Sequence, residues 1–249
     1  MLYIWIYSLI SVLIVSLISF IGIVTLSLDE NKIRNYLLYF VSFAAGALFG
    51  DVFIHLIPEI VREYGFGLRI GSSLLLGIIL FFIIEKFIHW RHCHAPESKG
   101  HIHTFAILNL IGDGVHNFID GLVIGASYLT SIPVGIATTI AVVLHEIPQE
   151  IGDFSVLIHG GFTKGKALFV NFLTALTAFL GVIIALLINN YIQGTSKFLL
   201  PLAAGGFIYI AGTDLIPELH KEVKISRSLI QLLAFILGII LMILLVFIE

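Results

Sequence analysis

One stretch of the sequence places groups that bind metals or protons inside an otherwise apolar run. Residues 145–153 read His-Glu-Ile-Pro-Gln-Glu-Ile-Gly-Asp, which supplies one histidine, three carboxylates, an amide and a proline. Ionisable groups at membrane depth are costly unless they face a partner or a water-filled cavity. We therefore interpret this stretch as the centre of a functional site.

A second polar stripe precedes it in the segment 104–128. At about 100° per residue of a helix, its members share one face within an arc of roughly 100°; they are Asn109, Asp113, His116, Asn117 and Asp120. On the segment 134–158 the polar face is wider, roughly 140° by the same periodicity, and consists of His145, Glu146, Gln149, Glu150 and Asp153. Pro148 cannot donate a hydrogen bond to the carbonyl of Leu144, so we expect a kink that opens the backbone there.

The two stripes contain carboxylates but no nearby cation, because no Lys or Arg occurs between Lys99 and Lys164. Buried carboxylates without a cation must take up protons or bind a metal ion. Imidazole beside carboxylate and amide oxygens suits Zn²⁺ and similar divalent ions, whereas Ca²⁺ and Mg²⁺ prefer sites made of oxygen alone. Three pairs have the i, i+4 spacing that allows chelation: His116 with Asp120, Glu146 with Glu150, and His145 with Gln149.

Two further candidates come from the segment 36–58. His55 follows Asp51 by four residues, and Glu59 follows His55 by another four. We expect this series to line an entrance or exit path. Asp214 and Glu218 occupy a comparable place near the end of the segment 198–218. Glu59 and Glu218 are equally typical of carboxylates at the membrane interface, so only Asp51 and His55 join the candidate metal ligands.

The whole chain reads as an all-α integral membrane protein. Of its 249 residues, 59% are apolar and 12% are charged, which is outside the range of soluble domains. Runs of about 20 apolar residues predict one transmembrane domain, residues 1–249, with eight helices at roughly 3–26, 36–58, 68–89, 104–128, 134–158, 166–190, 198–218 and 228–248. The single cysteine, Cys93, excludes an internal disulfide.

The charges predict the orientation in the membrane. Ten of the 13 Lys and Arg residues lie in the loops after spans 1, 3, 5 and 7, and they are Lys32, Arg34, Lys86, Arg91, Lys99, Lys164, Lys166, Lys221, Lys224 and Arg227. Positive charge accumulates on the cytosolic side of membrane proteins. We therefore expect both termini on the non-cytosolic side.

Spans 2 and 7 share a sequence pattern that indicates an inverted repeat. Residues 44–59 begin with Ala-Ala-Gly and end with Leu-Ile-Pro-Glu, and residues 203–218 do the same at an offset of 159. With spans 4 and 5 as a central antiparallel pair, the axis between them would relate spans 1 to 3 with spans 8 to 6. Inverted repeats around a site at mid-membrane are typical of secondary transporters. Chance recurrence of these motifs in a chain of biased composition is the alternative.

The segment 90–103 is predicted to be a cytosolic His-rich loop. Together with His89, this region holds five of the ten histidines and Cys93. Clustered His and Cys are typical of a labile metal-binding tract, here a sensor or an acceptor of ions leaving the pore. A solvated loop with a chance enrichment in histidine is the other interpretation.

These motifs resemble those of the Zrt/Irt-like (ZIP) family of divalent-metal transporters. The resemblance rests on Gly112–Gly121 and on residues 145–153, with support from the patterns in spans 2 and 7. It is strongest to the branch of the family whose fifth span reads HEIPHEIGD. In this chain Gln149 replaces the second histidine of that motif. It implies import of Zn²⁺ into the cytosol through a binuclear site, with Fe²⁺, Mn²⁺ and Cd²⁺ as further candidate substrates. The family's metal positions match His116, Asn117, Asp120, His145, Glu146 and Gln149, and Glu150 matches the motif.

The resemblance also implies a homodimer in which spans 1, 4, 5 and 6 move against the others, and a place in the plasma membrane. An intramembrane zinc hydrolase is the alternative function, since His-Glu-x-x-His on a helix pairs two zinc ligands with a general base. Gln149 at the second ligand position disfavours it. A proton-linked carrier of a non-metal solute would use membrane carboxylates but would not need this combination of imidazole and amide.

Overall fold

A computed structural model describes residues 2–25, 30–90, 104–191 and 196–248, in which all regular structure is helical. The helices form eight consecutive rods, in agreement with the eight predicted spans. Four rods are single helices: α5 (Leu68–Trp90), α6 (Thr104–Thr130), α7 (Ile132–His159) and α12 (Ile225–Leu245), the last followed by a 3₁₀ turn. Seven rods are long and apolar enough to cross a membrane; the exception among the described residues is α6, which carries the polar stripe.

The other four rods break or change helix type along their length. They are α1 (Leu2–Ile18) with a 3₁₀ turn and α2 (Gly22–Thr25); α3 (Glu30–Gly50) with a π-helical turn (Asp51–Leu56) and α4 (Ile57–Tyr64); α8 (Lys164–Ala175) with α9 (Thr177–Tyr191); and α10 (Ser196–Ile210) with a π-helical turn (Ala211–Leu215) and α11 (Ile216–Leu219). The predicted span 6 is therefore two helices that meet at Leu176, whereas α7 continues through Pro148 without a break.

Both π-helical turns end immediately before an Ile-Pro-Glu sequence. Proline has no N–H to donate to the carbonyl four residues earlier, and its ring crowds that carbonyl. The helix responds by widening, since the N–H of Ile57 donates to the carbonyl of Val52 and the N–H of Ile216 donates to that of Ala211, five residues back in each case. Such insertions in α-helices are frequent at functional sites.

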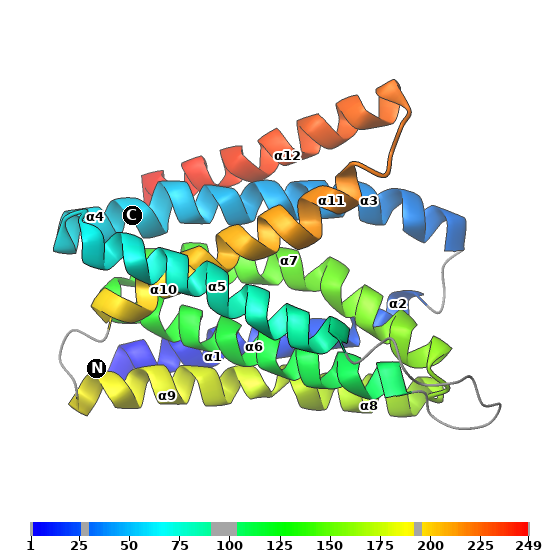
Figure 1. Cartoon of the computed structure of the whole chain (residues 1–249), viewed down its shortest axis with the longest axis horizontal. Helices are drawn as coiled ribbons and strands as arrows, with labels where there is room; N and C mark the ends of the chain where they lie inside the picture. Colours follow the sequence, from blue (N-terminus) through cyan, green and yellow to red (C-terminus); the bar gives the residue numbers. More distant parts are fainter. Residues whose placement is uncertain (1, 26–29, 91–103, 192–195, 249) are drawn as a thin grey trace.

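The rods divide into two groups, which Figure 1 shows as the upper and lower parts of the bundle. In one group α3 packs along α12, and α5 packs along α10. In the other, α6 packs against α9, α8, α7 and α1. The groups meet where α7 contacts α3 and where α6 contacts α10. We call these the α3/α10 group and the α6/α7 group. The start of α1 and the end of α12 lie at the same end of the bundle (Figure 1).

Close helix packing in the α3/α10 group depends on glycines. A methyl group added at Gly46 would lie 2.0 Å from the carbonyl oxygen of Phe235 on α12, and one added at Gly205 would lie 2.0 Å from that of Leu74 on α5. The reverse contacts also exist: Gly238 of α12 faces the carbonyl of Phe43, and Gly77 of α5 faces that of Leu202. Small residues at such crossings let helix backbones approach closely inside a membrane.

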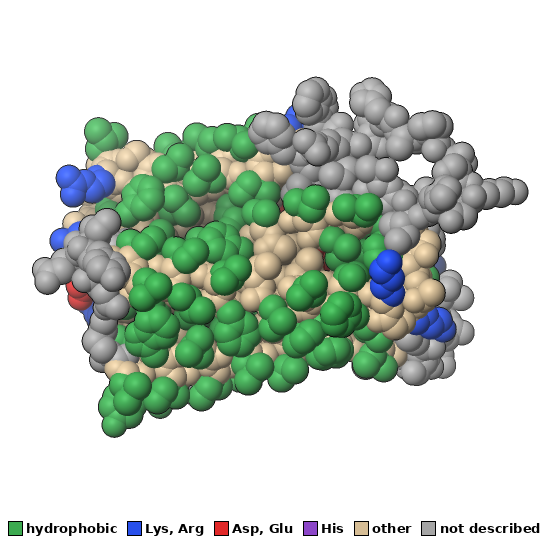
Figure 2. Space-filling view, turned by 90° about the horizontal axis from the view of Figure 1, so that it is seen from below, with side chains coloured by type: hydrophobic (Ala, Val, Ile, Leu, Met, Phe, Trp, Pro, Cys, Tyr) green, Lys and Arg blue, Asp and Glu red, His purple; other side chains and the backbone are tan. Residues whose placement is uncertain are grey.

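The outer surface agrees with a membrane environment. Figure 2 shows hydrophobic side chains over the middle of the bundle and Lys and Arg side chains towards its two ends. Without water in the hydrocarbon region, helices are the structures that satisfy their own backbone hydrogen bonds there. The predicted His-rich loop, including Cys93, lies outside the described residues, apart from the end of α5.

Candidate metal site

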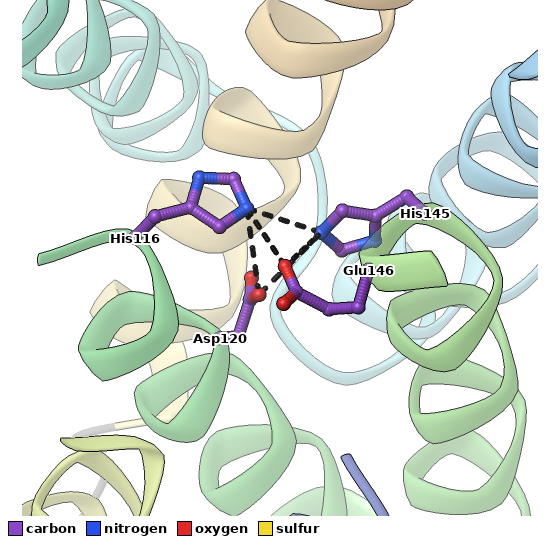
Figure 3. Close-up of side chains that lie close together, drawn as sticks. All are labelled: His116, Asp120, His145 and Glu146. Atoms are coloured by element: carbon purple, nitrogen blue, oxygen red, sulfur yellow. Dashed lines mark hydrogen bonds and ion pairs between the residues drawn. The ribbon is translucent and has the colours of Figure 1, made fainter. Parts of the chain in front are cut away.

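Two histidines and two carboxylates meet between α6 and α7 (Figure 3). His116 and Asp120 are one turn apart on α6, and His145 and Glu146 are neighbours on α7; one ligand atom from each lies within 4.8 Å of all the others. The Nε2 atom of His116 is 3.2 Å from Nε2 of His145 and 3.2 Å from Oε1 of Glu146. Nε2 of His145 is 3.4 Å from Oδ2 of Asp120. We call these four residues the His–carboxylate cluster.

The cluster is almost completely removed from solvent. Asp120 and Glu146 are fully buried and His145 is 1% exposed, while the side chain of His116 keeps 12% of its surface accessible. None of the carboxylate oxygens of Asp120 and Glu146 receives a hydrogen bond within the described part of the chain. In the described part of the chain the ion-pair partners of these two buried carboxylates are imidazoles, so the pair requires protons or a metal cation.

The hydrogen bonding of His145 prepares it to bind a metal. Its Nδ1 atom is 3.1 Å from the carbonyl oxygen of Ala141, one turn earlier in α7. A carbonyl can only accept, so Nδ1 carries the proton and Nε2 keeps its lone pair, which faces the cluster. A hydrogen bond at the distal nitrogen is the usual way in which proteins fix the tautomer and orientation of a metal-binding histidine.

Aromatic rings from the α3/α10 group hold the two imidazoles from the other side. Phe207 of α10 lies 5.8 Å from the ring of His145, and Phe81 of α5 lies 6.5 Å from that of His116, both near perpendicular. Both phenylalanines are buried. The result is a set of two imidazole nitrogens and two carboxylate oxygens in apolar surroundings, which is the donor type and number that four-coordinate Zn²⁺ takes.

Three other predicted ligands lie in a hydrogen-bonded network beside the cluster. Asn117 donates through Nδ2 to Oδ1 of Asp113, at 2.7 Å, and Asp113 accepts a second bond from the hydroxyl of Thr174 on α8. Glu150 accepts a bond from the Nδ2 atom of Asn171, also on α8. Asn117, Glu150 and Asn171 are fully buried, and each keeps one side-chain oxygen without a hydrogen bond.

Gln149 lies on the wall of a cavity of about 150 Å³ that also borders His116 of the cluster. Asn109, Asp113, His116 and Asp153 also line this cavity, and the Nδ2 atom of Asn109 is 2.8 Å from Oδ1 of Asp153. The remaining walls come from the C-terminal half of α5 and from α10 and its π-helical turn, including Glu85, Tyr209 and Asp214. The cavity thus reaches the cluster only at His116.

The structure places the other two predicted ligands, Asp51 and His55, outside the cluster. Both lie in the π-helical turn of the α3/α10 group. Nε2 of His55 donates to the carbonyl oxygen of Met242 on α12, at 2.9 Å. Oδ1 of Asp51 accepts a bond of 3.4 Å from the hydroxyl of Thr138, which belongs to α7. Sequence periodicity assigned these residues to a polar helix face but could not identify the helix opposite.

Sequence reasoning missed the contribution of α8. Asn171 is a lone polar residue in an apolar span, and Thr174 is an ordinary helical threonine in the sequence. The structure shows that both contact carboxylates of the polar network. Their spacing of three residues, which places them on one helix face, was the only available signal.

The chain is similar in sequence to known zinc transporters. Residues 2–105 and 91–246 match the sequence model of a family described as ZIP Zinc transporter. Zinc transporter ZIP13 of Pongo abelii is 33% identical over 261 residues, which cover 96% of this chain and 78% of the relative. Zinc transporter zipt-7.1 of Caenorhabditis briggsae is 33% identical over a stretch that covers 82% of this chain and 69% of the relative. Zinc transporter SLC39A7 of Homo sapiens is 29% identical over a stretch that covers 98% of this chain and 71% of the relative.

Proposed function

Because the chain belongs to the ZIP family of zinc transporters, we propose that it carries Zn²⁺ into the cytosol through the His–carboxylate cluster. The family consists of transporters and not of enzymes, so the hydrolase alternative is wrong. The observation that carries the proposal is the set of buried ligand atoms from two antiparallel helices, at the end of a cavity. A transported ion needs ligands that replace its water and a path by which water returns.

The position of the cavity supports access to the cluster from the cytosolic side. Its walls come from the C-terminal half of α5, the N-terminal half of α6 and the C-terminal half of α7. These helix ends adjoin Lys86 of α5, Arg91 and Lys99 in the segment that follows α5, and Lys164 and Lys166 in the first turn of α8. The positive-inside bias assigns this side to the cytosol and both termini to the opposite side. In this arrangement the structure corresponds to an inward-facing state.

An inverted repeat between spans 1 to 3 and spans 6 to 8 is also part of the proposal. The two π-helical turns end at Ile57 and Ile216, which differ by the offset of 159 found in the sequence. The glycine contacts also correspond, since α3 with α12 repeats the packing of α10 with α5. This pairing favours a match of spans 1, 2 and 3 with 6, 7 and 8 in chain order, rather than the reversed order expected from an axis between spans 4 and 5. Such repeats are compatible with alternating access.

Other expectations remain predictions. They are the homodimer, the plasma membrane as location, a binuclear site, and the roles of Asp51 and His55 in an access path. The movement of spans 1, 4, 5 and 6 against the others is supported by the division of the rods into the same two groups. The His-rich loop as an acceptor of released ions is a further prediction. So is transport of Fe²⁺, Mn²⁺ or Cd²⁺.

Uptake of radiolabelled Zn²⁺ into proteoliposomes tests the proposal. We expect saturable uptake by the wild type and its loss in His145→Ala and in Glu146→Gln, since each removes a ligand. Glu222→Gln is the matched control, because Glu222 is a carboxylate paired with Arg227 at 3.2 Å and belongs neither to the cluster nor to the predicted access path. Equal uptake by the wild type and Glu146→Gln would contradict transport through this site.

A further inference from the structure

The orientation of one buried amide is fixed by its neighbours. The Nδ2 atom of Asn117 lies 2.7 Å from Oδ1 of Asp113 and 3.2 Å from the backbone carbonyl oxygen of the same residue. A backbone carbonyl only accepts hydrogen bonds, so the amide nitrogen must be the atom that faces Asp113. The amide oxygen therefore points away from Asp113. It is buried and receives no hydrogen bond in the described part of the chain.

Asp113 is itself held by a residue from another helix. Its Oδ2 atom accepts a bond from the hydroxyl of Thr174 on α8. The same hydroxyl lies within reach of two backbone carbonyls, those of Val170 at 3.3 Å and Asn171 at 2.8 Å. It has one proton for three acceptors. Of these three contacts, the one with Asp113 links α8 to α6, whereas the other two stay within α8.

We propose that Thr174 and Asp113 are positioning residues, which present the side-chain oxygen of Asn117 as a ligand to the transported divalent cation. This inference rests on the proposed function and assigns a role to α8 that nothing in the sequence motifs provides. Asp113, predicted above as a ligand, then acts through Asn117, as a carboxylate behind a metal-binding imidazole does.

Equilibrium binding of Zn²⁺ and Mn²⁺ to the purified full chain, measured by titration calorimetry, tests this role. Thr174→Val keeps the shape and removes the hydroxyl, and loss of such an outer contact typically lowers metal affinity by about 10-fold to 100-fold. Mn²⁺ prefers oxygen ligands more than Zn²⁺ does. We therefore expect a larger loss for Mn²⁺ than for Zn²⁺, with recovery of both affinities in Thr174→Ser.

The chain offers a matched control three residues away. Thr177 also donates to α6, but to the backbone carbonyl of Gly114, at 2.6 Å, and to no carboxylate. Thr177→Val should leave the ratio of Zn²⁺ to Mn²⁺ affinity unchanged. In an Asn117→Ala background, Thr174→Val should have no further effect, because the oxygen that it positions is gone. Should Thr174→Val fail to fold, Thr174→Ala takes its place in the same cycle.

Two results would overturn the inference: an equal loss for both metals in Thr174→Val and Thr177→Val, or an undiminished effect of Thr174→Val without the Asn117 amide. Either would assign Thr174 to helix packing. Uptake is measured separately in proteoliposomes. Wild-type protein that binds both metals with the expected dependence on Thr174 but does not transport Zn²⁺ would refute the proposed function and leave the positioning role intact.

Discussion

The α6–α7 crossing and the α3/α10 group both place histidine and carboxylate side chains inside the membrane, but they use them differently. In the His–carboxylate cluster the oxygens of Asp120 and Glu146 receive no hydrogen bond from the residues that the structure describes, and Nε2 of His145 faces Asp120. In the α3/α10 group His55 donates to a backbone carbonyl of α12, and glycines bring the helices into backbone contact. The two histidines show that residue type alone does not identify a metal site: Nε2 of His145 faces carboxylates, whereas Nε2 of His55 donates to a backbone carbonyl.

The largest expected effect separates the two buried histidines. His116→Gln removes a cluster nitrogen and should lower the rate of Zn²⁺ uptake at subsaturating zinc by at least about 100-fold, since even outer contacts of metal sites are worth 10-fold to 100-fold. His55→Gln should lower it by less than about 10-fold, because His55 contacts a backbone carbonyl and its loss costs one hydrogen bond. Proteoliposome uptake measures both variants. A comparable loss in both would place His55 in the transport path.

The next effect concerns stability of the α3/α10 group. Gly46→Ala and Gly205→Ala would each push a methyl group to 2.0 Å from a backbone carbonyl. Overpacking of this kind costs about 1–3 kcal/mol, which we expect as a lower thermal unfolding midpoint in detergent. Gly71→Ala serves as the control because the added methyl group meets nothing within 4 Å. Similar midpoints for all three variants would show that the helices can separate without cost.

A smaller effect is expected at the edge of the site. Gln149 lines the cavity beside His116 and has an amide where the resembling motif has histidine. Gln149→His adds an imidazole next to the cluster and should raise Zn²⁺ affinity by less than about 10-fold, which is below the usual effect of an outer contact. Competition with Mn²⁺ in the binding assay measures the change. A loss of Zn²⁺ affinity would indicate that the amide, and not its replacement, contributes to binding.

Much of this architecture could be predicted from the sequence, because membrane helices are long apolar runs and polar stripes follow the helical period. The eight rods and the convergence of His116, Asp120, His145 and Glu146 follow from these two signals. The period orders residues around one helix axis only. It could not show that Met242 lies opposite His55, that Leu176 divides span 6, or that Gln149 lies along the cavity.

The contact of the described cavity with the His–carboxylate cluster at His116 has a kinetic consequence. The cavity borders His116 but none of the other three cluster residues. An ion bound by all four would meet incoming water first at its bond to His116, while the bonds to Asp120, His145 and Glu146 stayed dry. Dissociation would then proceed by stepwise ligand exchange and would never produce a bare ion. The lifetime of the bound state would depend on how readily the imidazole of His116 turns away.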